Sequence, residues 1–184
     1  MSQVEIRLSL FEILEAASKG VMRQVQNLEK RRRQSNNHDP SRDWQDHING
    51  ALGECAVAKW LGIYWSGNLG CLQAADVGPL EVRTRSRPGY DLILHESDPD
   101  DRIFILVTGL NGEYVIRGCI LARDGKRREF WKDPAGGRPA FFVPQSELRD
   151  VECLINHRGG DDDGSTLFHV ARAGGQSGVR DSAG

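Results

Sequence analysis

The chain has 184 residues, a length that suits one domain with a substantial hydrophobic core. Hydrophobic residues make up 39% of it and charged residues 27%, with a mean hydropathy of -0.49, which is typical of a globular protein and excludes a membrane-spanning class. The net charge of -2 excludes a globally basic surface, so any contact with nucleic acid would come from local patches.

The cysteines and the N-terminus indicate the compartment. The four cysteines are widely separated and form no Cys-x-x-Cys pair, which argues against a thiolate zinc site or a disulfide framework. The N-terminus has no apolar segment after a basic stretch, and no apolar run approaches membrane-spanning length. We therefore expect a cytoplasmic protein with no membrane partner.

The first 33 residues predict a strand followed by a helix. Apolar and charged residues alternate over residues 4–8, which is typical of an edge strand. Ser9 and Glu12 fit a capping box, so a helix should begin there and run to about Arg33. Gly20 is expected to weaken or kink this helix. Apolar residues at helical spacing predict its core-facing side: Phe11, Leu14, Ala17, Val21, Val25 and Leu28.

A second helix is predicted between residues 39 and 62, and it carries an unusual acid. Asp39 suits its N-cap, Pro40 its first position and Gly62 its C-terminal cap. On such a helix Glu54 has small or apolar neighbours, namely Gly50, Ala51, Val57 and Ala58. This face would bury the carboxylate, which is costly unless the charge is paired or binds a cation. We therefore interpret Glu54 as functional, with a surface position as the alternative.

The stretch from Asp76 to Arg87 predicts a hairpin that places two acids together. Gly78-Pro79 suits a two-residue loop, because glycine accepts the positive φ of its first position and proline the negative φ of its second. Asp76 then lies opposite Glu81, with Cβ atoms roughly 5 Å apart on one side of the sheet. Two such carboxylates repel unless a divalent cation lies between them. A solvated, charged hairpin is the alternative that this stretch leaves open.

Side chains alternate along the strand after this loop. Glu81, Arg83 and Arg85 share one face, and Leu80, Val82 and Thr84 share the other. The strand therefore has a charged face and a packing face.

The remaining sequence predicts further strands and a polar tail. Strands are expected over residues 90–95, 102–108, 113–121 and 139–144, and Asn111-Gly112 suits a hairpin turn between the second and third of them. A short helix is expected from Ser146 to about Leu154. Residues 157–184 are mostly Gly, Asp, Ser and Arg, which is typical of a flexible tail. We thus divide the chain into an N-terminal strand and helix (1–38), a core (39–156) and this tail.

Two charged segments lie between these strands. The acidic run 98–101 lacks the ligand spacing of a calcium-binding loop and predicts a solvated turn. Lys126, Arg127 and Arg128 stand near Trp131 in a Gly-rich excursion. Basic residues beside an aromatic ring are candidate nucleic-acid contacts, although an ordinary exposed loop has the same composition.

From residue 44 to residue 154 the sequence resembles the PD-(D/E)XK nuclease superfamily, and in particular a group of small phage-encoded proteins. The resemblance rests on five segments: Gly50-Ala-Leu-Gly-Glu54-Cys-Ala-Val-Ala-Lys-Trp-Leu-Gly62, Asp76-Val-Gly, Glu81-Val-Arg-Thr84, Gly118-Cys-Ile and Phe142-Val-Pro. It implies an α+β (α/β) fold of the restriction-endonuclease-like type, with a central mixed β-sheet flanked by helices. It also implies a bacterial cytoplasm or a phage-infected host cell.

The resemblance implies a magnesium-dependent or manganese-dependent nuclease that cuts DNA, with no other cofactor. Glu54, Asp76 and Glu81 would hold the metal, Arg83 would brace the scissile phosphate, and Arg85 and Arg87 would steer the backbone. Arg83 departs from the family pattern, which has lysine there. Arginine does not lose its proton and cannot act as a general base, so a weakened enzyme is expected. A homodimer is compatible with this picture.

Two other functions stay open. A catalytically degenerate nuclease-fold protein would bind nucleic acid or protein in phage biology without cutting. An inhibitor that binds a host or phage protein through the loops of Trp65 and Trp131 has no specific support in the sequence.

Overall fold

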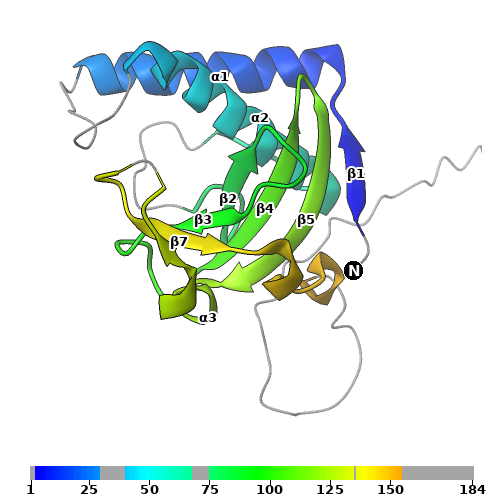
Figure 1. Ribbon diagram of the computed structural model, residues 1–184. Coiled ribbons are helices and arrows are strands. Elements are labelled where there is room, and N and C mark those ends of the chain that lie inside the picture. Colours follow the sequence, from blue (N-terminus) through cyan, green and yellow to red (C-terminus); the bar gives the residue numbers. More distant parts are fainter. Residues whose placement is uncertain (1–2, 30–39, 68–74, 135, 155–184) are drawn as a thin grey trace, which may run out of the picture.

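The computed structural model describes residues 3–29, 40–67, 75–134 and 136–154 (Figure 1). The helices are α1 (Leu10–Glu29), α2 (Asp43–Leu61) and α3 (Ala122–Gly125). The strands are β1 (Val4–Arg7), β2 (Leu80–Arg85), β3 (Leu92–Leu94), β4 (Ile103–Leu110), β5 (Glu113–Leu121), β6 (Trp131–Lys132) and β7 (Ala140–Val143). Short 3-10 turns cover Pro40–Arg42, Arg128–Phe130, Gln145–Glu147 and Val151–Leu154.

The larger sheet is mixed and has the strand order β1-β5-β4-β2. β5 pairs antiparallel with both β1 and β4, whereas β2 pairs in parallel with β4. The β4–β5 hairpin turns at Asn111 and Gly112, whose φ angles of 55° and 92° fit the predicted two-residue turn. β2 is an edge strand of this sheet, so its outer side is open to the segment that carries Asp76.

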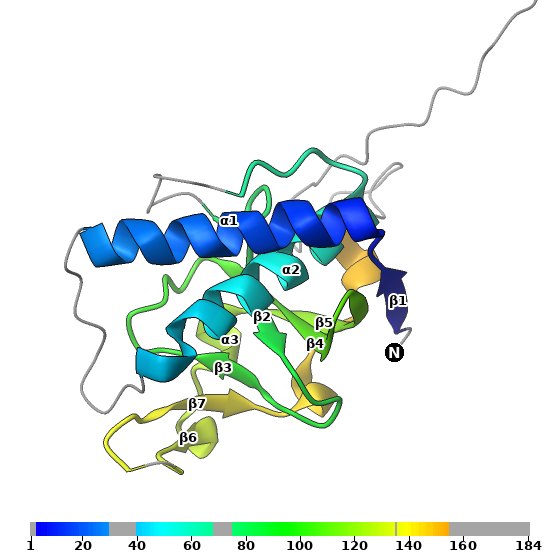
Figure 2. The same cartoon turned by 90° about the horizontal axis from the view of Figure 1, so that it is seen from above.

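The two faces of the sheet are covered differently (Figure 2). α2 packs on one face, with α1 outside it, and a second antiparallel sheet of order β3-β7-β6 covers the other. The α+β class is therefore confirmed. The expected flanking by helices is met on one face only, because the chain after β5 forms mainly short strands and turns.

The buried side of α1 differs from the prediction. Its buried residues are Ala16, Gly20 and Gln24, while Phe11 is 81% exposed. A Cβ atom on Gly20 would lie 2.5 Å from the Cα atom of Ile48 in α2. Gly20 therefore allows the two helices to pack closely and does not kink α1, which runs unbroken to Glu29.

Other local predictions are confirmed or corrected. Ser9 and Glu12 form the capping box, with hydrogen bonds of 2.6 and 3.3 Å. α2 ends at Gly62, which caps it in the left-handed conformation, but Pro40 opens a 3-10 turn and the α-helix begins only at Asp43. The helix expected at residues 146–154 is replaced by two 3-10 turns. Asp39, residues 30–33 and the tail lie outside the described residues, and so do residues 71–74 of the segment 71–75, which the hairpin prediction implies as its first strand.

In the described part of the chain, none of the helices combines the length and the apolar character needed to cross a bilayer.

Candidate functional site

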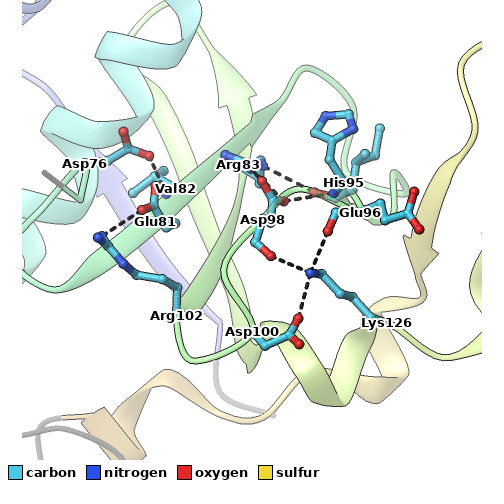
Figure 3. Close-up of polar contacts among 11 residues, drawn as sticks. Asp76, Glu81, Val82, Arg83, His95, Glu96, Asp98, Asp100, Arg102 and Lys126 are labelled. Carbon is cyan, nitrogen blue, oxygen red and sulfur yellow. Dashed lines mark hydrogen bonds and ion pairs between the residues drawn. The ribbon is translucent and has the colours of Figure 1, made fainter. Parts of the chain in front are cut away.

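The predicted hairpin at Gly78-Pro79 is present. Val77 and Leu80 exchange two backbone hydrogen bonds of 3.0 Å, and Gly78 has a φ of 57°. The amide of Val82 donates a hydrogen bond of 2.8 Å to Oδ2 of Asp76 (Figure 3). The hairpin and this bond fix Asp76 at the outer side of β2.

Asp76 and Glu81 form a pair of neighbouring carboxyl groups, as predicted (Figure 3). Burial and then the negative charge of Asp76 raise the pKa of Glu81 to about 7, and a hydrogen bond joins the two side chains. The positive charge of Arg102 lowers the pKa of Glu81, since its Nη1 atom lies 3.0 Å from Oε1 of Glu81. The pair is therefore half-buried, and the charges of Arg102 and Arg83 lower the pKa of Glu81 by less than burial and Asp76 raise it.

Glu54 is buried in α2, as the small residues around it predicted, and is 4% exposed. α2 lies close against β2 at this point, because a Cβ atom on Gly53 would fall 1.9 Å from Oγ1 of Thr84. Arg23 of α1 donates from Nη1 and Nη2 to the two carboxylate oxygens of Glu54, both at 2.6 Å. The same guanidinium donates to the carbonyl of Gly67 at 2.8 Å. Arg23 and Glu54 thus form a bidentate ion pair.

Asp76 links the two glutamates electrostatically. Burial raises the pKa of Glu54 to about 7, Arg23 opposes this, and the charge of Asp76 adds to the rise. The charge of Asp76 also raises the pKa of Glu81. Since Asp76 acts on both, the three predicted acids belong to one electrostatic cluster.

The cluster fits a metal ion only in part. Carboxylate oxygens are the ligands that Mg²⁺ and Mn²⁺ prefer, and the Asp76–Glu81 pair brings two carboxyl groups together. Glu54, however, has both oxygens engaged by Arg23. Over the described ranges no group of three His, Cys, Asp or Glu side chains is arranged to hold a metal ion. The carboxyl groups of the Asp76–Glu81 pair therefore suit a cation, whereas Glu54 does not, because both of its oxygens are bonded to Arg23.

Arg83 makes its described bonds away from the acid pair, although its charge lowers the pKa of Glu81. Its Nη2 atom is 2.9 Å from both carboxylate oxygens of Asp98, and its guanidinium lies 4.7 Å from the ring centre of Phe104 (Figure 3). Asp98 also accepts a bond from the amide of His95. The acidic run 98–101 is thus not simply a solvated turn, because Asp98 is a half-buried counter-ion for Arg83.

Two of the three basic residues at 126–128 have internal partners. Lys126 bonds to the carbonyls of Glu96 and Asp98 and lies 2.7 Å from Oδ1 of Asp100, so its side chain is only 13% exposed (Figure 3). The guanidinium of Arg127 pairs with Glu129 and Glu147. Of the three, only Arg128 is exposed without a described ion pair, and the nucleic-acid contact of this segment stays a prediction.

A cleft of about 630 Å³ opens at the far end of β2, and we call it the arginine cleft. Its charged and polar lining residues are Arg42, Asp46, Asn49, Arg83, Thr84, Arg85, Ser86, Tyr90 and Arg138. In the described ranges Arg42, Arg85 and Arg138 form no ion pair with a carboxylate. Arg85 instead lies over the ring of Tyr90 at 4.6 Å. These three cations are available for an anionic ligand.

Sequence reasoning missed Arg23, Arg102, Asp98 and the cleft residues Arg42 and Arg138. No local pattern identifies them, because each meets its partners only through helix packing or strand pairing. Arg102, for example, reaches Glu81 because Ile103 pairs with Leu80 in the parallel β2–β4 ladder.

Comparison of the chain with protein-family models, curated proteins and solved structures found no match. Its functional class is therefore argued from the acid pair and the arginine cleft alone.

Proposed function

We propose that the protein is a metal-dependent nuclease of the restriction-endonuclease-like fold that acts on DNA. The observation that carries the proposal is the Asp76–Glu81 pair at one end of β2 with the arginine cleft at its other end. Glu81 and Arg85 are four residues apart on one strand, a span of roughly 13 Å. Cation ligands and phosphate-binding groups therefore lie along one line on the surface.

Each group has a role that follows from its position. Asp76 and Glu81 would hold Mg²⁺ or Mn²⁺, which when bound supplies a Lewis acid that activates water near neutral pH. Arg42, Arg85 and Arg138 would bind backbone phosphates next to the site. Arg83, held by Asp98, would support the strand and the cleft and would not touch the scissile phosphate.

Hydrolysis assays test the proposal. Plasmid, linear duplex and single-stranded DNA are incubated with the protein and Mg²⁺ or Mn²⁺, and Glu81→Gln is compared with Glu113→Gln. Glu113 is an exposed acid at the opposite end of the sheet, with a side chain 76% exposed, and serves as the matched control. We expect cutting that Glu81→Gln reduces at least a hundredfold and Glu113→Gln leaves unchanged. Absence of cutting, or equal cutting by both variants, would refute the nuclease.

One observation favours a second candidate, a nuclease-fold protein that binds DNA without cutting it. Arg23 occupies the oxygens of Glu54 that a third metal ligand would need. Such a protein would bind DNA in the presence of a chelator, with an affinity that falls when Arg85 and Arg138 are replaced by alanine. Fluorescence anisotropy with labelled DNA measures this, and calorimetric titration with Mn²⁺ shows whether the acid pair binds metal at all.

A further inference from the structure

α1 carries a line of exposed apolar side chains that no described element covers. Figure 2 shows α1 as the outermost layer, with α2 between it and the sheet. α2 packs against a different side of α1, the side of Ala16, Gly20 and Gln24. The exposed fractions of the large apolar residues on α1 range from 38% to 83%, and these residues are Leu10, Phe11, Leu14, Val21, Met22, Val25 and Leu28.

The spacing of these residues is that of a coiled-coil seam. Residues 11, 14, 18, 21, 25 and 28 follow one another at alternating intervals of three and four, which is a heptad repeat sustained over the described helix. Five of the six are apolar, and the exception is Ser18. Its hydroxyl donates to the carbonyl of Leu14 at 2.8 Å, so it can lie in an apolar seam with its hydrogen bond already made. A seam of this period fits another helix of the same period.

The exposed area matches what a stable interface needs. If a fully exposed large apolar side chain offers at most about 200 Å², the seven exposed side chains, five in the seam and Leu10 and Met22 beside it, offer up to roughly 800 Å². This approaches the surface of about 800 Å² that each partner buries in a protein interface of standard size. It also exceeds the patches of about 300–600 Å² that single-chain proteins usually leave open.

We infer that this seam of α1 binds the α1 helix of a second copy of the chain, forming a homodimer through a short coiled coil. The partner helix has by definition the same repeat and the same length, so the apolar layers match from end to end. The polar tail at residues 157–184 has few apolar residues with which to cover the seam. A membrane surface is disfavoured, because α1 carries three glutamates (Glu12, Glu15 and Glu29) against two basic residues, Lys19 and Arg23, and Arg23 is held by Glu54.

The oligomeric state of the full-length chain tests the inference. Sedimentation velocity over a range of concentrations compares the wild type with Leu14→Glu/Val21→Glu, Ser18→Leu and Lys132→Glu. We expect a concentration-dependent dimer in the wild type and at least a tenfold weaker dimer in Leu14→Glu/Val21→Glu. Ser18→Leu should tighten the dimer at least tenfold, because it replaces the polar residue of the seam. Lys132, which is exposed in β6 of the second sheet, on the face of the larger sheet opposite to the helices, provides the control and should change nothing.

Other results would overturn the inference. A wild type that stays monomeric at the highest concentration, or a dimer that Leu14→Glu/Val21→Glu leaves unchanged, contradicts it. A monomeric wild type that Leu14→Glu/Val21→Glu destabilises would show that the chain's own residues cover the seam. Binding of a monomer to phosphatidylcholine–phosphatidylglycerol vesicles, abolished by the same variant, would assign the seam to a membrane. Circular dichroism of every variant verifies that the helix content is retained.

Discussion

Arg23 and Glu54, which are 31 residues apart, are joined by two hydrogen bonds of 2.6 Å between the guanidinium and the carboxylate. This contact ties α1 to α2 and compensates a carboxylate that is almost completely buried. It also places the arginine guanidinium at the oxygens of Glu54, where a metal ion was expected. The acid of α2 therefore has a structural role in this arrangement.

Removing the arginine should destabilise the fold. Arg23→Met leaves the Glu54 carboxylate buried without its partner, which costs about 3–5 kcal/mol in comparable buried pairs. Arg7→Met is the control, because Arg7 makes an exposed contact of 3.9 Å with Glu113 and its loss should cost less than about 1 kcal/mol. Urea denaturation of both variants measures the difference. Equal stability of the two would show that the buried pair contributes little.

Two glycines should respond in opposite ways to alanine. At Gly20 a Cβ atom would meet the backbone of Ile48 at 2.5 Å, so Gly20→Ala should destabilise by about 1–3 kcal/mol despite its better helix propensity. At Gly50 a Cβ atom meets nothing within 4 Å, and Gly50→Ala should stabilise by about 0.5–1 kcal/mol. Thermal and urea denaturation compare the two. A stabilising Gly20→Ala would contradict the close packing of α1 on α2.

Metal binding should strengthen as pH rises. The pKa of Glu81 is raised to about 7, so below that pH the carboxyl group is mostly protonated and a cation must displace the proton. The affinity for Mn²⁺ should therefore increase by up to about tenfold per pH unit below 7 for each proton displaced and level off above about pH 8. Calorimetry at several pH values measures it. In Glu81→Gln the dependence should largely disappear, and a flat profile in the wild type would exclude this carboxyl group as a ligand.

A charge placed in the arginine cleft should weaken DNA binding without harming the fold. Gly50 lines the cleft on α2 and has open space before it, so Gly50→Glu introduces a carboxylate among Arg42, Arg85 and Arg138. We expect at least a tenfold loss of DNA affinity at low salt, since the proposed function assigns the phosphate contacts to these cations. Gly50→Ala, which adds no charge, should bind like the wild type. Unchanged binding by Gly50→Glu would place the DNA elsewhere.

The sequence alone determined the features that depend on residues close together in the chain. The capping box of Ser9 and Glu12, the cap at Gly62 and the turns at Gly78 and Asn111 follow from local backbone chemistry. The burial of Glu54 was also predictable, because small neighbours on a helix let another element approach.

Only the tertiary structure decided which groups meet across the fold. Helical periodicity showed that α1 has an apolar side but not what covers it, and the side expected in the core is the exposed one. The partners of Glu54, Glu81 and Arg83 are 15 to 31 residues away and meet them through helix packing, the parallel β2–β4 pairing and the loop after β3. Such contacts depend on the arrangement of whole elements, for which a local pattern carries no signal.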